Sequence, residues 1–297
     1  MVSIRESMKS SEAKAGIGFI LPFLAGFLIF NLFPLLYAFY ISLVDYNTLK
    51  PSFNFIGFDN FTRIFHDPIA LQAYWSSFLY TLIYVPALIV LSFFLAVLLN
   101  RKFFLRPVSR TMILIPYVAN VIAIAMVWSM ILDPYDGPVN AFLHLIGVQN
   151  PPMWLGGTKT ALPTIALVNV WQSLSFQTIV FLAALQGVPK ELYEASELDG
   201  AGRWKKVRNV TIPLVSPTTF FLVITSVIGS FQNYASVRAL TNGGPGVASR
   251  VISLNIYEEA FTYNRYSYAA AQAILLFGVI LVITIIQWRG QKKWVHY

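Results

Sequence analysis

The chain contains no cysteine, which excludes disulfides, thiol catalysis and zinc sites built from thiolates. Charge is also scarce: Asp, Glu, Lys and Arg make up 11% of the 297 residues, whereas 57% are hydrophobic and the mean hydropathy is +0.63. A chain with so little polar surface does not dissolve as a globule. The composition therefore predicts a membrane protein.

Signatures of an enzyme are missing as well. The segment GGTK at 156–159 lacks the spacing of a phosphate-binding loop, so the chain is not expected to bind or hydrolyse ATP by itself. Glu258 and Glu259 are adjacent and fall on different helix faces, which predicts solvated residues in an external loop rather than an acid–base pair. No metal site or cofactor is expected, because the histidines show no metal-ligand spacing: His66, His144 and His296.

Six apolar segments are long enough to cross a hydrocarbon core, which takes about 20 residues. The first is too long for the apolar part of a signal peptide and no small-residue cleavage site follows it, so we expect it to stay as an anchor helix. Prolines within or at the start of three segments, Pro86, Pro116 and Pro163, predict kinks that serve either as hinges or only as curved packing. The segments lie near 16–44, 76–100, 108–132, 161–186, 212–237 and 268–289.

The positions of Lys and Arg predict the orientation. With the N-terminus inside, internal segments hold 15 of the 21 basic residues and external loops hold six, so the positive-inside rule places both termini in the cytoplasm. The net charge of +8 then reflects topology, and no nucleic-acid partner is expected. The internal residues are Arg5, Lys9, Lys14, Arg101, Lys102, Arg106, Arg110, Lys190, Arg203, Lys205, Lys206, Arg208, Arg289, Lys292 and Lys293.

The resulting prediction is an all-α polytopic membrane protein with six transmembrane helices. A cytoplasmic tail at 1–15 precedes a transmembrane domain at 16–289, and a second cytoplasmic tail follows at 290–297. External loops are predicted at 45–75, 133–160 and 238–267, and a cytoplasmic loop at 189–211. The external part also contains a predicted surface helix within 137–156, with Val139, Phe142, Leu143 and Ile146 on one face, and a tight turn at 242–246.

The predicted cytoplasmic loop is a polar stretch between two apolar segments, and its sequence predicts a short helix followed by a basic run. Pro189 suits a first helical position and Gly200 supplies a stop. Between them, side chains at three- and four-residue spacing form a small apolar stripe on an otherwise charged helix: Leu192, Ala195, and Leu198 or Ser196. Such a stripe suits a groove in a partner protein. The basic run contains Arg203, Lys205, Lys206 and Arg208, and Pro213 marks the return to an apolar segment.

This loop closely resembles the EAA loop of ABC importer permeases. Glu194-Ala195-Ser196 is followed by Asp199-Gly200-Ala201 and then by Ile212-Pro213. Two departures are small: Ser196 stands where the family usually has Ala, and Ile212 where Leu is common. The resemblance implies that the helix docks into a cleft on an ATPase subunit, with Glu194 fixing the docking helix and Gly200 allowing a close turn. The implied coupling residues are Glu194, Ala195, Ser196, Leu198, Asp199, Gly200, Ala201 and Pro213.

Three further segments resemble sugar permeases of the maltose type: FIGFDNF at 55–61, VNVW at 168–171 and LTNGGP at 240–245. The resemblance covers nearly the whole chain. It implies a type I importer fold in the cell membrane of a prokaryote, and transport of a carbohydrate, expected to be a di- or oligosaccharide. The implied partners are a second, similar permease, two ABC ATPase subunits that bind ATP and magnesium, an extracellular solute-binding protein and membrane lipid.

Two predicted helices carry neutral polar faces beside the EAA loop. Residues at i, i+3, i+4 and i+7 share a face on the first, and residues at i, i+4 and i+7 on the second. Such faces suit a neutral polyol, because amides and hydroxyls bond without charge and an aromatic ring stacks on a sugar. The same residues equally suit hydrogen bonds between helices in lipid. The candidate pathway residues are Asn169, Gln172, Ser173, Phe176, Ser226, Ser230 and Asn233.

Three alternatives stay open. The chain could serve an importer of a polyol phosphate if the partner permease supplies the cations that phosphate requires. A secondary carrier would transport without an ATPase, but no charged residue lies deep in a span as such carriers commonly need. A membrane-embedded glycosyl transferase would need an acidic pair, for which Asp133 and Asp136 are the candidates.

Overall fold

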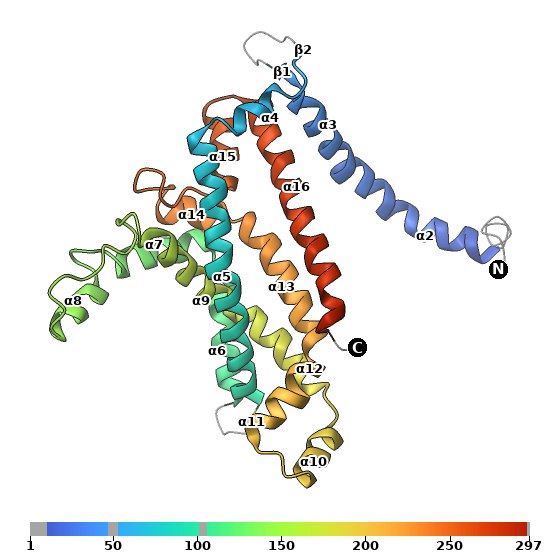
Figure 1. Ribbon diagram of the computed structural model, residues 1–297, viewed down its shortest axis with the longest axis vertical. Helices are drawn as coiled ribbons and strands as arrows, with labels where there is room; N and C mark the ends of the chain where they lie inside the picture. Colours follow the sequence, from blue (N-terminus) through green and yellow to red (C-terminus); the bar gives the residue numbers. More distant parts are fainter. Residues whose placement is uncertain (1–10, 47–52, 101–105, 296–297) are drawn as a thin grey trace. The chain divides into compact units, whose positions relative to one another are not determined.

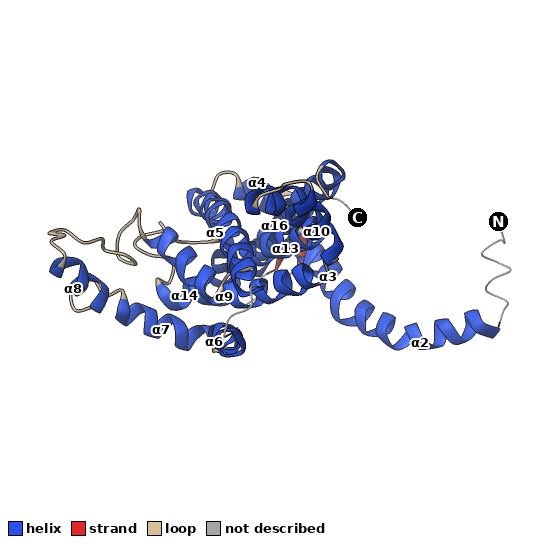
Figure 2. Cartoon of the chain, turned by 90° about the horizontal axis from the view of Figure 1, so that it is seen from below, coloured by secondary structure: helices blue, strands red, loops and turns tan. Residues whose placement is uncertain are grey.

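The computed structural model describes residues 11–46, 53–100 and 106–295, and these residues are almost entirely helical (Figure 2). Five of the basic residues used to predict the orientation lie outside the described residues: Arg5, Lys9, Lys50, Arg101 and Lys102. The all-α class is confirmed, since the strands amount to one short two-stranded sheet within the described part.

The chain divides into two compact units, each of which combines segments distant in sequence. The first unit contains Met1–Arg63 and Glu258–Leu275, and the second contains Ile64–Tyr257 and Leu276–Tyr297. Helix α16 contributes to both. The elements of the first unit are α2 (Ser11–Phe27), η1 (Leu28–Leu32), α3 (Phe33–Ser42), β1 (Val44–Tyr46), β2 (Phe53–Phe55), α4 (Asp59–Ile64), η3 (Glu258–Thr262) and the start of α16 (Tyr266–Gly290).

The first unit begins with the predicted anchor helix, which is continuous through α2, η1 and α3 (Figure 1). Its apolar stretch Gly16–Ser42 is long enough to span a membrane, and the most apolar part has no buried residue, as expected for a helix that faces lipid. The chain then turns into the antiparallel pair β1–β2, in which Val44 lies opposite Phe55. Asn60 fixes this turn, since its Nδ2 donates to the Ser42 carbonyl at 3.0 Å.

The prediction of solvated glutamates at the external loop is wrong. Glu258 and Glu259 are both buried, with 8% and 7% of their surfaces exposed. Glu259 pairs with Arg265, whose Nη1 lies 3.3 Å from its Oε2. The two residues begin the π-helix η3, and the surrounding structure covers both of their side chains.

The second unit contains the remaining helices. They are α5 (Pro68–Asn100), α6 (Arg106–Val118), α7 (Val121–Ile131), α8 (Pro138–Leu145), α9 (Ala161–Gln186), α10 (Lys190–Leu198), α11 (Arg203–Lys206), η2 (Val207–Thr211), α12 (Ile212–Leu214), α13 (Ser216–Phe231), α14 (Ala235–Leu240), α15 (Ile252–Tyr257), the rest of α16, and η4 (Gln291–Lys293).

Helices α5 and α9 form the most extensive helix pair, and the core of the second unit lies along their contact. Asp67 starts α5 by accepting the backbone N–H of Ile69 at 2.9 Å, and Pro68 occupies the first helical position. The buried side chains on this contact are Tyr80, Tyr84, Leu88, Ile165, Ala166, Val168 and Phe181.

Two of the six predicted spans are bent rather than straight. The segment at 108–132 consists of α6 and α7, which meet at 98°. Pro116 weakens the helical bonding near the end of α6, and Asn120 restarts the helix because its Oδ1 accepts the backbone N–H of Ile122 at 2.8 Å. Four helices are therefore long enough to span alone, and the described part reaches six spans if each bent pair counts as one.

The second bend separates Arg203–Leu214 from Ser216–Phe231 by 65°. Pro217 has no backbone N–H, so the carbonyl of Pro213 cannot receive the usual helical bond and instead accepts the Ser216 hydroxyl at 2.6 Å. The basic run, which was predicted as a loop, is helical. The predicted fifth span ends earlier than expected, at Phe231 in α13.

The outer connection contains the predicted surface helix, α8, and a turn that tolerates only glycine. A Cβ at Gly137 would meet the Asp133 carbonyl and would lie 2.7 Å from the Asp133 nitrogen and 2.8 Å from the Ile131 carbonyl. At Gly278 in α16, by contrast, a Cβ would meet nothing within 4 Å. The backbone of this turn is therefore closely packed.

We predict that Gly137→Ala destabilises the protein by about 1–3 kcal/mol, because backbone atoms must move to admit the methyl group. Gly278→Ala is the matched control and should change stability little or raise it, since alanine favours a helix. Thermal unfolding of the purified membrane protein compares the two. Equal melting temperatures for both variants would contradict the packing described here.

Candidate functional site

Helix α10 begins and ends with well-defined caps. Pro189, predicted as the first helical position, lies one residue before the helix and acts as its N-cap, with ψ at 134°. At the other end Gly200 adopts φ of +72°, and the N–H groups of Gly200 and Ala201 donate to the carbonyls of Glu197 and Ser196, both at 2.9 Å. This is a Schellman motif, which confirms the predicted glycine stop.

The inner face of α10 is tied to the helices that follow it. The Tyr193 hydroxyl lies 3.1 Å from the Thr211 hydroxyl, and Lys206 forms an ion pair with Glu197. The Ser196 hydroxyl donates to the Tyr193 carbonyl at 2.7 Å, a bond within α10 itself. Bonds from two positions of this short helix, Tyr193 and Glu197, connect α10 with the stretch from α11 to α12.

The outer face of α10 is unpartnered within the described chain. Leu198 is 91% exposed and Leu192 43% exposed, and Glu194 and Ala195 beside them are exposed as well. Exposed apolar side chains that adjoin one another on a helix surface mark an interaction site more than a single exposed leucine does. The predicted stripe of Leu192, Ala195 and Leu198 is therefore available for docking. The other predicted coupling residues lie at the C-terminal cap (Asp199, Gly200, Ala201) and in α12 (Pro213).

A second core supports the base of this loop. Val188, just before α10, is buried with Leu185 of α9 and Val215 at the bend before α13. Side chains from the end of α5, including Leu99, complete the cluster, and Tyr193 and Val210 pack against it. The loop is thus attached to α5, α9 and α13 together.

The polar positions predicted on α9 and α13 mostly bond to other helices. Asn169 is buried, and its Nδ2 donates to the Tyr80 hydroxyl at 3.0 Å and to the Ser236 hydroxyl at 2.9 Å. Ser236 donates in turn to Oδ1 of Asn233 at 2.6 Å. This chain of bonds joins α5, α9 and the start of α14.

Three more pairs join α5, α9 and α13. The Tyr84 hydroxyl donates to Ser173 at 2.8 Å, and the hydroxyls of Thr81 and Ser230 lie 2.7 Å apart. Ser226 accepts from Nε2 of Gln177 at 2.6 Å. Sequence reasoning missed the partners on α5, although a polar row at three- and four-residue spacing signals them: Ser77, Tyr80, Thr81 and Tyr84.

Gln172 and Phe176 are arranged differently from the other predicted pathway residues. Phe176 is 43% exposed and stacks on Tyr117 of α6, with ring centroids 5.2 Å apart. Gln172 lies one turn away on the same side of α9, and its Nε2 reaches the Ala119 carbonyl at 3.5 Å, in the break between α6 and α7. Trp171 is 42% exposed. It lies on another side of α9, where its ring packs edge to face against Trp128 of α7. We call Tyr117, Gln172 and Phe176 the aromatic face.

The central helices of the second unit are free of charged residues, whereas charged residues occur at its surface. Helices α5, α7, α9 and α13 contain no ionisable Asp, Glu, Lys or Arg. At the outer surface the backbone N–H groups of Asp136 and Tyr135 hold the pKa of Asp133 below its usual range. No group of three His, Asp or Glu gathers as a metal site in the described ranges.

Comparison with known proteins gives a consistent result. The family model "binding-protein-dependent transport system inner membrane component" matches residues 88–293. The trehalose/maltose transport system permease protein MalF of Thermococcus litoralis is 31% identical over 96% of each chain. The sn-glycerol-3-phosphate transport system permease protein UgpA of Pectobacterium atrosepticum is 29% identical over 94% of each chain. A subunit in a crystal structure of a bacterial alginate ABC transporter has the same fold, with a TM-score of 0.82, 24% identity and 98% and 97% coverage.

We predict that Asn169→Ala lowers the melting temperature of the purified protein, because the Tyr80 and Ser236 hydroxyls lose a buried partner at about 0.5–1.5 kcal/mol for each bond. Gln172→Ala is the matched control: its side chain is half-exposed, so stability should stay within about 0.5 kcal/mol. In transport assays the order of the two variants should be opposite: Gln172→Ala should raise the KM for substrate, and Asn169→Ala should leave it unchanged. A raised KM together with an unchanged melting temperature for Asn169→Ala would assign Asn169 to the pathway instead.

Proposed function

Since the chain belongs to the family of binding-protein-dependent transport system inner membrane components, we propose that it is the permease subunit of an ABC importer for a neutral carbohydrate. It forms one half of the translocation pathway, and a second, homologous permease forms the other half. An extracellular solute-binding protein delivers the sugar, expected to be a di- or oligosaccharide. Two ABC ATPase subunits bind ATP and magnesium and supply the energy.

The observation that carries the substrate class is the aromatic face beside charge-free helices. Tyr117 and Phe176 offer ring surface to the C–H face of a sugar, while Gln172 offers an amide donor and acceptor. Asn169, Ser173, Ser226, Ser230 and Asn233 act mainly by joining helices, so their effect on substrate is indirect. The related trehalose/maltose permease supports a carbohydrate.

A polyol phosphate is the second candidate, because one relative is named for sn-glycerol 3-phosphate transport. Phosphate recognition relies on Arg or Lys, and none lies within α5, α7, α9 or α13. A phosphate substrate would therefore depend on cations from the second permease. A neutral sugar needs no such contribution and is the simpler fit.

Coupling to the ATPase is assigned to the outer face of α10. The apolar stripe of Leu192, Ala195 and Leu198 inserts into a cleft of the ATPase, and Glu194 at its edge adds a polar contact. Movement of α10 reaches α13 through the Tyr193–Thr211 bond, the Glu197–Lys206 ion pair and the helical stretch from α11 to α12. It reaches α9 through the buried Val188. The bend before α13 then converts loop movement into a change of helix angle.

The Gly200 cap tests this coupling. An L-residue in the left-handed conformation costs about 1–2 kcal/mol, while asparagine tolerates it better than a β-branched residue does. A side chain at Gly200 would meet no atom within 4 Å, so only backbone conformation distinguishes substitutions. We predict that Gly200→Val lowers ATPase stimulation by loaded binding protein about tenfold, whereas Gly200→Asn stays near the original activity. Full activity of both variants would show that this cap has no part in coupling.

The function itself is tested with the co-expressed complex of both permeases and the ATPase in lipid. We expect one binding protein, loaded with one neutral sugar, to stimulate ATP hydrolysis and drive uptake into proteoliposomes. Stimulation only by a loaded polyol-phosphate binding protein would favour the second candidate. If the chain alone moved solute without nucleotide, it would act as a secondary carrier and the ABC assignment would fail.

A further inference from the structure

Two cavities lie on either side of the helical turns that follow Gly202, both within the second unit. The first has a volume of about 390 Å³ and is polar on one side, where Asn100, Tyr193, Arg203, Lys206 and Thr211 line it. Its floor is apolar and includes Val97. Neither cavity belongs to the aromatic face or to the outer stripe of α10.

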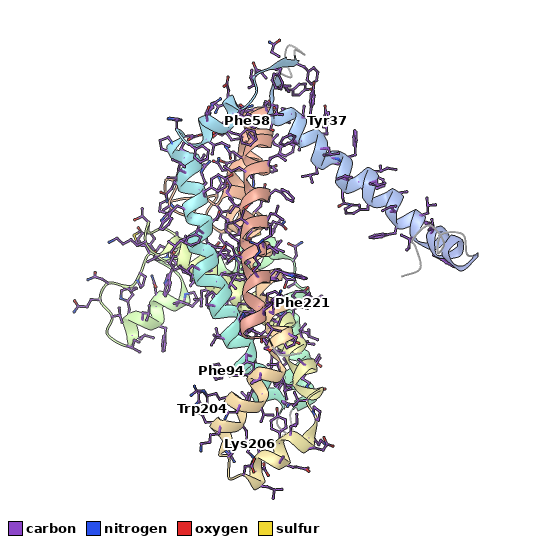
Figure 3. The ribbon with its side chains drawn as sticks, turned by 45° about the vertical axis from the view of Figure 1, so that its right-hand side comes forward. Tyr37, Phe58, Phe94, Trp204, Lys206 and Phe221 are labelled. Carbon is purple, nitrogen blue, oxygen red and sulfur yellow. The ribbon has the colours of Figure 1, made fainter. Side chains whose placement is uncertain are left out.

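The second cavity has a volume of about 270 Å³ and is almost entirely apolar. Its walls include Phe93, Phe94, Trp204, Val207 and Ile212. Phe94 is 55% exposed and Trp204 is 68% exposed, so the cavity opens at the surface of the unit. Figure 3 labels Phe94, Trp204 and Lys206, which lie toward the same end of the helices. The cavity is a groove that admits an apolar chain.

The two cavities are adjacent. Val207 lines both, and α5 contributes Phe93 and Phe94 to the apolar groove and Val97 and Asn100, one to two turns further on, to the polar cavity. Together they form one amphipathic pocket with an apolar end toward the middle of α5 and a cationic end at its cytoplasmic terminus. An occupant with an anionic head and an apolar tail matches this division.

Charge complementarity identifies the head. Arg203 forms no ion pair with a carboxylate in the described part of the chain, and Lys206 pairs with Glu197. The residues that line the polar cavity include Arg203 and Lys206 and no Asp or Glu, and Asn100, Tyr193 and Thr211 add neutral hydrogen-bonding groups. A phosphate diester fits such a site, because guanidinium and ammonium groups bind phosphate.

The position in the membrane identifies the tail. The cytoplasmic side of the membrane attracts basic segments through its anionic lipids, and basic pockets between spans on this side bind phospholipid head groups. Trp204, at the mouth of the apolar groove, is the residue type that lies at the level of the head groups. A soluble phosphate compound would leave the groove beside Phe94 and Trp204 empty.

We propose that this amphipathic pocket binds one anionic glycerophospholipid of the cytoplasmic leaflet. The phosphate lies between Arg203 and Lys206, and one acyl chain lies in the groove between Phe94 and Trp204. The lipid thereby contacts α5, the end of α9, α10 and α11 together. It braces the loop that carries α10 and so makes coupling depend on anionic lipid.

The binding test uses the assembled complex in nanodiscs of phosphatidylcholine with a small fraction of phosphatidylglycerol, followed by native mass spectrometry of the lipid that remains bound. We expect one retained phosphatidylglycerol. Arg203→Gln should reduce retention about fivefold, because one basic group near an anionic surface contributes about 1 kcal/mol. Arg203→Lys should restore most of it, and Trp204→Ala should reduce retention by weakening the apolar end.

Arg208→Gln is the matched control, since Arg208 belongs to the same basic run and is exposed but lines neither cavity. It should leave retention unchanged. Equal loss in Arg203→Gln and Arg208→Gln would mean that the lipid is held by the general charge of the loop, and the pocket would be rejected. Displacement by glycerol 3-phosphate at the same concentration as phosphatidylglycerol would show an anion site without a tail groove, and would also overturn the proposal.

This proposal needs only the membrane location of the chain and not its transported substrate. Lipid retention is measured without sugar, binding protein or ATP, so a wrong sugar assignment would leave the result unaffected. Absence of any retained phosphatidylglycerol in the unsubstituted complex would reject the pocket while leaving the importer function intact.

Discussion

Hydrocarbon offers no hydrogen-bond partners, so every polar group within the membrane must be satisfied by the protein itself. The contact of α5 with α9 meets this constraint with bonds between side chains, and the rest of the second unit is arranged around them. Tyr80 on α5 reaches Asn169 on α9, and Tyr84 reaches Ser173 a turn further along. The amide of Asn169 also holds Ser236, which attaches the segment after α13. The polar residues thereby specify which helices pair and in what register.

The same constraint explains where the bends occur. At the second bend Pro217 removes a helical bond, and the Ser216 hydroxyl satisfies the Pro213 carbonyl instead. At the first bend Asn120 caps the restarted helix α7 by accepting the Ile122 N–H. Each bend lies next to a proposed functional feature. The first is beside the aromatic face, and the second is between the coupling loop and α13. The helix direction can therefore change at these two points without breaking backbone hydrogen bonds in the neighbouring helices.

The coupling loop is neither a free loop nor a rigid extension of one helix. Its inner face is bonded through Tyr193 and Glu197, its base is buried through Val188, and its outer leucines are exposed. Under the proposed function, a push on the outer face would reach several helices at once through these contacts. The proposed lipid would occupy the space behind this lever, where Arg203 and Lys206 line a cavity at the end of α5.

The amino-acid sequence by itself determined the membrane location, the apolar segments and the glycine stop at Gly200, because each depends on local composition or on one backbone conformation. The bounds of α9 agree with the predicted segment to the residue. Only the tertiary structure decided which polar side chains bond between helices. The spacing of Asn169, Gln172 and Ser173 shows a shared face, but whether that face meets α5 or a cavity depends on residues nearly 90 positions away. Burial of Glu258 and Glu259 was decided in the same way, since it depends on what packs around η3 and not on the local sequence.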